Sequence, residues 1–133
     1  MPERNASYYG PLKALAIERD TDCREAYERI LGFSAPLPRE AVLHHVAHRG
    51  GCPSKDSEDN VITLTWEDHR DRAHGPEEIR YRKRCMEYLR CEEVEAWRRE
   101  HAEEIAAFEA KKEDSRIRAV RKHCAVKRVR RIR

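Results

Sequence analysis

The stretch VLHHVAHRGGCPSKDSEDNVITLTWEDHRDRAHG, from Val42 to Gly75, decides the expected fold of this 133-residue chain. The run Ala41 to His48 alternates loosely in polarity, and the pair Gly50-Gly51 after it marks a turn. Beyond a polar loop, Val61 to Trp66 is the most strand-like run, because β-branched and aromatic residues dominate it. The two runs predict an antiparallel hairpin, and a helical turn is expected from about Glu67 to Gly75.

Helical patterns lie on both sides of this hairpin. Apolar residues recur at helical intervals from Pro11 to Leu31, which predicts two short helices or one interrupted helix. A long helix is expected over 76–110, with one apolar stripe that packs either on its own domain or on a second copy in a homodimer. The chain is therefore expected to be α+β and mainly helical, with a small antiparallel hairpin. We divide it into a helical segment (1–40), a hairpin-and-helix core (41–75), the long helix (76–110) and a basic arm (111–133).

Composition argues against several classes of protein. Charged residues make up 40% of the chain and apolar residues 39%, so the core must be small. The sequence has no apolar run of about 18 residues, and no apolar stretch follows the charged residues at its N-terminus. We therefore expect no membrane span or secretory signal, and a cytoplasmic protein. The five cysteines form no Cys-x-x-Cys pair, which excludes a four-cysteine zinc site. Because their number is odd, they cannot form a complete disulfide framework either.

The positive charge is concentrated at the end of the chain. Residues 111–133 hold eleven Lys or Arg and only two acids, whereas the first 110 residues are net negative. Such an arm is attracted to polyanions, because each neutralised phosphate releases counterions. A solvated tail is the equally weighted alternative.

Histidines are the chain's unusual chemical feature, and His44 and His45 stand next to each other on the first predicted strand. Neutral imidazole is both a ligand for Zn, Ni, Co or Mn and a general base near neutral pH. Neighbouring side chains on a strand point to opposite faces, so only one of the pair can face a metal held against the following helix. The other is then free to act on a water molecule.

The stretch from Val42 to Gly75 resembles the ββα-metal motif of the HNH nucleases. This resemblance implies that His44 is the first metal ligand and that His45 is the general base. It implies further that Asn60 braces the loop that carries the base, and that His69 on the helix is the second metal ligand. The expected cofactor is one divalent ion: Mg, Mn, Zn, Ni or Co.

Two features depart from the family pattern. Many members add a zinc ribbon of two Cys-x-x-Cys pairs, which this chain lacks. A third ligand commonly follows one helical turn after the second, but here His74 stands five residues after His69. On a regular helix this spacing rotates the side chain by about 140°. His74 is therefore expected to reach the metal only if the helix ends or loosens at Gly75, and otherwise water fills that position.

The resemblance implies hydrolysis of phosphodiester bonds in double-stranded DNA. Members of the family that are encoded by phages or mobile elements suggest packaging, restriction or homing as contexts. Two alternatives stay open, an inactive nucleic-acid-binding module and a protein that binds partners through its long helix. The basic residues predicted to contact DNA, or otherwise to be plain surface charges, are Arg49, Arg70, Arg72, Lys127, Arg128, Arg130 and Arg131.

Overall fold

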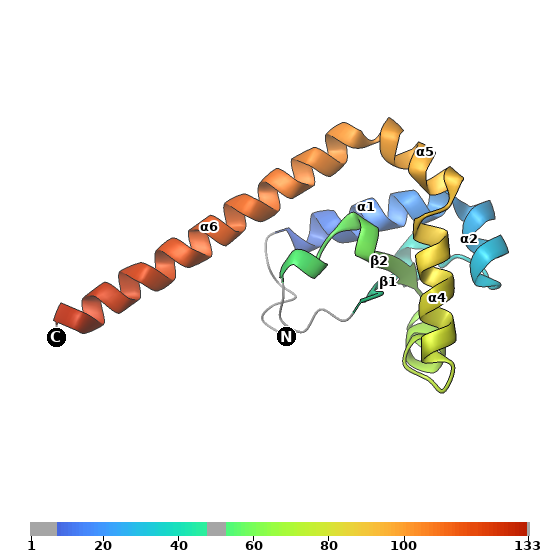
Figure 1. The fold of residues 1–133 in the computed structure, drawn as a ribbon, viewed down its shortest axis with the longest axis horizontal. Helices are drawn as coiled ribbons and strands as arrows, with labels where there is room; N and C mark the ends of the chain where they lie inside the picture. Colours follow the sequence, from blue (N-terminus) through green and yellow to red (C-terminus); the bar gives the residue numbers. More distant parts are fainter. Residues whose placement is uncertain (1–7, 48–52, 133) are drawn as a thin grey trace.

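The computed structural model describes residues 8–47 and 53–132, without the side chains of residues 53, 123 and 125–132. It has a mainly helical α+β fold, which confirms the fold class predicted from the sequence (Figure 1). The elements are α1 (Tyr9–Asp22), α2 (Arg24–Leu31), β1 (Val42–His45), β2 (Val61–Leu64), α3 (Trp66–Asp68), a π-helical turn (His69–Ala73), α4 (Glu78–Leu89), α5 (Glu92–Glu100) and α6 (Ala102–Ile132).

The predicted hairpin is present as an antiparallel pair, β1 with β2. His44 lies opposite Ile62 and His45 lies opposite Val61. The second strand ends before Trp66, because the Thr65 side chain accepts a hydrogen bond from the backbone N–H of Asp68 at 3.2 Å and so caps α3. Every residue of β2 is buried, so this strand lies inside the helical layers rather than at their surface.

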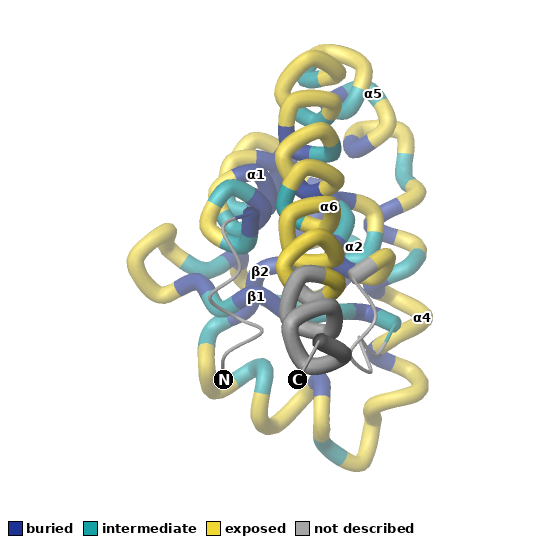
Figure 2. The backbone as a smooth tube through the Cα atoms, turned by 90° about the vertical axis from the view of Figure 1, so that its left-hand side faces the viewer, coloured by how far each residue is buried: buried dark blue, intermediate teal, exposed yellow. Residues whose placement is uncertain are grey.

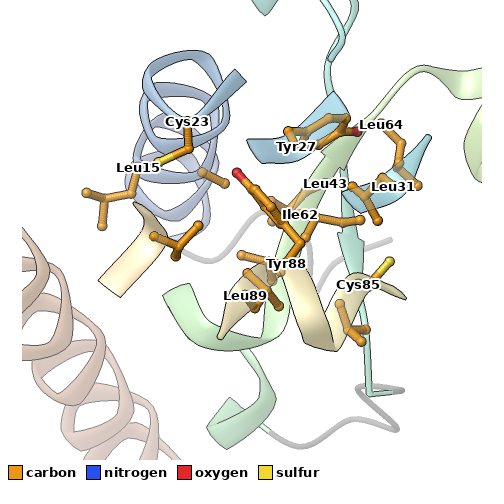
Figure 3. Close-up of a cluster of buried hydrophobic side chains, with 14 of the residues drawn as sticks. Leu15, Cys23, Tyr27, Leu31, Leu43, Ile62, Leu64, Cys85, Tyr88 and Leu89 are labelled. Atoms are coloured by element: carbon orange, nitrogen blue, oxygen red, sulfur yellow. The ribbon is translucent and has the colours of Figure 1, made fainter. Parts of the chain in front are cut away.

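Helix α1 packs against β2, and buried side chains of α1, α2, α4 and both strands form one core (Figure 3), with the buried residues spread along these elements (Figure 2). A buried charged network joins α1 to the second strand. The Arg19 guanidinium is fully buried and donates to the carbonyls of Glu58 and Val61, each at 2.6 Å. The carboxylate of Asp20 accepts from both the backbone N–H and the hydroxyl of Thr63. These bonds fix β2 and the loop before it, which carry part of the site described below.

The helix predicted over 76–110 is instead three helices, with breaks at Arg90-Cys91 and at His101. A straight helix over 76–110 would extend past the small core, so part of its apolar stripe would have nothing to pack against. The breaks allow Val94 and Trp97 of α5 to be buried against the core, where the Trp97 indole also donates to Asp22 at 2.9 Å.

The boundary predicted at Lys111 falls inside α6, which continues through the basic arm (Figure 1). Phe108 packs edge-on against Tyr8, with ring centroids 6.1 Å apart, and the Lys112 ammonium donates to the backbone carbonyl of Asp56 at 3.1 Å. The first residues of α6 therefore belong to the body of the protein. Beyond them the helix projects away from it (Figure 1). Among the residues described, no helix combines the length and apolarity needed to cross a membrane.

Candidate metal centre and catalytic site

Three histidines from two elements meet at one end of the hairpin. His44 extends from β1 and is 8% exposed, while His69 begins the π-helical turn and His74 directly follows it. Their ligating nitrogens lie within 4.8 Å of one another. The His69 and His74 rings are nearly perpendicular, and their Nε2 atoms are 3.2 Å apart. Three imidazoles at these distances form a ready set of donors for one transition-metal ion.

The π-helical turn explains how His74 joins this set. A π turn bonds each residue to the fifth one along, so residues five apart fall on the same face. The sequence left two alternatives open for His74, and the structure has the one in which the helix loosens and His74 lies beside His69. Gly75 allows this turn, because a Cβ atom at that position would lie 2.0 Å from the backbone oxygen of Asp71.

His44 is held in its neutral form. Burial, together with the neighbouring His69 and His74, lowers the pKa of His44 to about 3. An imidazole must be deprotonated to bind a metal ion. The His44 nitrogen is therefore available as a ligand throughout the physiological pH range.

The same shift makes the metal-free protein less stable in acid. In the unfolded chain His44 binds a proton below about pH 6.5, but in the folded protein it does so only near pH 3. This difference in protonation lowers the free energy of unfolding only below about pH 6.5. The reduction grows as the pH falls and reaches about 2 kcal/mol at pH 5. Urea unfolding of the metal-free protein at pH 7 and pH 5 measures it. In His44→Gln the loss of stability between these pH values should shrink by that amount, and an unchanged loss would contradict the expectation.

His45 points to the opposite side of β1 from His44. Its Nε2 lies 2.7 Å from Oδ1 of Asp56, a carboxylate with no exposed surface. Asp56 was not among the residues singled out from the sequence. It lies in the polar loop beside other acids, Glu58 and Asp59, and no sequence signal distinguishes it from them.

Asn60 ties both ends of the loop after β1 together. Its side-chain oxygen accepts from the backbone N–H of Ala47 at 2.9 Å. Its amide nitrogen donates to the carbonyls of Ala47 and Lys55 at 3.1 and 2.9 Å. These are the contacts that a loop-bracing residue needs, and they hold the chain two residues beyond His45.

The predicted DNA-contacting residues have different environments. Arg70 is exposed and pairs with Asp71, and Arg72 pairs with Asp68 while its guanidinium lies 4.6 Å from the centroid of the Phe33 ring. Both remain solvent-accessible beside the histidines. The other predicted contacts are Arg49, which lies outside the described residues, and Lys127, Arg128, Arg130 and Arg131, whose backbone belongs to α6 but whose side chains are not described.

Sequence reasoning also missed Arg82 of α4. It lines a cavity of about 20 Å³ together with His44 and His74. This volume suits one ion or one water molecule, so a larger ligand could lie only across its mouth. The Arg82 guanidinium pairs with Glu78 at 3.3 Å and is half exposed, which leaves it able to contact a phosphate there.

A second group of potential ligands, Glu18, His101 and Glu104, lies where α1 meets the start of α6. The hydrogen bond from His101 to the carbonyl of Trp97 and the nearby Glu18 carboxylate raise the pKa of His101. Its Nε2 is 3.2 Å from Glu18. Because both carboxylates are exposed, we interpret this group as an ion pair that joins α6 to α1.

In comparisons with known proteins, no family model, curated protein or solved structure matches the chain.

Proposed function

We propose that this protein is a divalent-metal-dependent DNA endonuclease of the HNH type. The observation that carries the proposal is the three-histidine cluster on one face of β1, with His45 on the other face and Asn60 bracing the loop beside it. A purely structural metal site has no need of a second, differently oriented imidazole. Three protein ligands also leave a coordination position open, as catalytic sites do and closed structural sites do not.

In this proposal each residue has a distinct task. His45 takes a proton from a water molecule, which then attacks phosphorus in line. Asn60 keeps the loop, and so the direction of His45, fixed. His44, His69 and His74 would hold a metal ion, which would supply electrostatic stabilisation of the transition state and of the leaving oxygen. Since all three donors are nitrogens, Zn²⁺, Ni²⁺ or Co²⁺ suits the site better than Mg²⁺, which prefers oxygen ligands.

Plasmid cleavage with and without EDTA tests the proposal. We expect nicking or linearisation that EDTA stops and that added Zn²⁺, Ni²⁺, Co²⁺ or Mn²⁺ restores. The His69→Ala protein, purified in the same way, controls for a contaminating nuclease. Persistent activity in that variant, or none in the wild type with any of these ions, would contradict the proposal.

The end of α6 supports one competing function. Ile117 and Val120 are 41% and 60% exposed on the part of this helix that projects from the body. A protein that works by helix pairing, as a homodimer or with another partner, would use such a surface. Sedimentation at several concentrations tests the homodimer, and the cleavage assay separates this function from that of a nuclease.

Replacing Asn60 by alanine should slow cleavage about tenfold or more while leaving DNA affinity within twofold of wild type. The variant loses three hydrogen bonds to the loop but no charge and no proposed ligand. Single-turnover cleavage and fluorescence anisotropy measure the two quantities. Cleavage at the wild-type rate would mean that the loop needs no brace.

Deleting residues 117–133 should weaken binding to all DNA sequences alike. The deletion removes eight basic residues and no acid, yet keeps Lys112 on Asp56. Because log K falls by about 0.9 per neutralised phosphate for each decade of salt, the salt dependence should flatten by several such steps. Binding isotherms at four salt concentrations measure this.

Cleavage at low salt and saturating protein should survive the same deletion, since none of the proposed site residues lies in the deleted segment. Deletion from residue 111 is the informative comparison, because it also removes Lys112 and should lower stability. An unchanged salt slope after deletion of 117–133 would show that this part of α6 does not contact DNA.

A further inference from the structure

Asp56 is a buried acid that bonds to distant parts of the chain. Its Oδ2 accepts from the hydroxyl of Tyr8 at 2.7 Å, and its Oδ1 lies 2.7 Å from Nε2 of His45. Its backbone carbonyl accepts from Lys112 at 3.1 Å. Burying a carboxylate is costly unless strong hydrogen bonds compensate for the lost water. Among the described residues, the imidazole that this carboxylate contacts is that of His45, the residue to which the proposed function gives the proton transfer.

We infer that Asp56 is a positioning residue that holds His45 in the tautomer and orientation needed for it to act as the base. This inference rests on the proposed function and deepens it. An ionised carboxylate has only acceptors, so the proton of the neutral His45 ring must lie on Nε2. Nδ1 then carries the free lone pair and is the atom that can take a proton from water.

The carboxylate also favours the charged ring that proton transfer produces. When water gives its proton to Nδ1, its oxygen keeps the electron pair that forms the bond to phosphorus, and His45 becomes a cation. The bond between phosphorus and the leaving oxygen of the diester breaks, and that oxygen takes the bonding electron pair. Asp56 keeps the Nε2 proton in a hydrogen bond throughout and gains an ion pair at that moment. Its contribution is therefore larger in the transition state than before reaction, so it should appear in kcat rather than in KM.

A structural role is the competing explanation, because Asp56 also joins the loop to Tyr8 and Lys112. Asp56→Asn separates the two explanations, since the amide has nearly the same shape but no charge. Asp59→Asn is the matched control: it removes one charge from the same loop, where Asp59 is exposed and accepts from Ser57. The ring nitrogens of His45 can be observed by ¹⁵N NMR, which reports the tautomer directly.

We expect Asp56→Asn to lower kcat about 100-fold, with KM and Zn²⁺ affinity within twofold of wild type, and Asp59→Asn to change none of them. In the metal-free wild type the ¹⁵N shifts should show a proton on Nε2 of His45. In Asp56→Asn they should show a mixture of tautomers. Thermal unfolding checks that both variants are folded.

Two results would overturn the inference: a folded Asp56→Asn protein with the wild-type kcat, or a wild-type His45 whose neutral form is not held as the Nε2–H tautomer. The second measurement needs no variant, so it decides the matter even if Asp56→Asn does not fold. A wild-type protein that does not cleave DNA would instead contradict the proposed function, and any role of Asp56 in proton transfer would be wrong with it. The nitrogen shifts would still establish whether Asp56 fixes the ring.

Discussion

Replacing His45 by alanine is expected to lower the rate of DNA cleavage about 1,000-fold or more, while divalent-metal affinity stays within a few fold of wild type. His45 lies on the face of β1 away from the three clustered nitrogens, so its loss removes no proposed ligand. General bases contribute about 100- to 10,000-fold to enzymatic rates, and this chain offers no second base on that face among the residues assigned to the site.

Calorimetric titration with Zn²⁺ and a nicking assay on the same preparations measure the two effects. His44→Ala is the matched comparison, because it removes the neighbouring imidazole from the same strand and should abolish metal binding and cleavage together. If His45→Ala loses metal affinity as severely as His44→Ala does, the two roles are assigned to the wrong residues.

The sequence predicted the hairpin well because local chemistry decides it. β-branched residues from Val61 onward favour a strand, and polar loop residues bound it on one side. Strand alternation alone predicted opposite faces for His44 and His45, and their contacts differ accordingly: His44 lies beside His69 and His74, and His45 contacts Asp56. The fold class and the antiparallel pairing were confirmed for these reasons.

The breaks in the predicted long helix depend on tertiary contacts that periodicity does not contain. The break at Arg90-Cys91 contains neither proline nor glycine, which are the usual sequence signals of a helix end. The chain turns there because Trp97 reaches Asp22, 75 residues earlier in the sequence. The same limit explains why Asp56 was missed: its partners Tyr8, His45 and Lys112 are brought to it only by the folded chain.

The position of His74 shows a different limit. Its spacing from His69 was visible in the sequence and identified two routes, but helical periodicity alone assumes the regular α-helix. His74 reaches His69 only if the backbone forms a π-helical turn, in which hydrogen bonds join residues five apart and not four. Gly75, where the sequence predicts that the helix ends or loosens, allows the close approach of the chain to Asp71.

Replacing Gly75 by alanine is therefore expected to lower metal affinity at least about tenfold, although residue 75 offers no ligand atom. The added Cβ would lie 2.0 Å from the backbone oxygen of Asp71, far inside van der Waals contact, so the turn must open or rewind. Either movement separates His74 from His69, whose nitrogens are now 3.2 Å apart. Cleavage should fall in parallel, whereas DNA affinity should hold, because the basic residues of α6 are unaffected.

Gly10→Ala is the matched control, because a Cβ at that exposed helical position meets nothing within 4 Å. It should leave metal affinity and cleavage unchanged. His69→Ala sets the other limit, since removing a ligand should abolish binding outright. Titration of all three variants with Zn²⁺, alongside thermal unfolding in EDTA, separates a displaced ligand from a general loss of structure. If Gly75→Ala stays folded and binds Zn²⁺ as tightly as wild type, the metal site does not depend on the π-helical turn, and His74 is not one of its ligands.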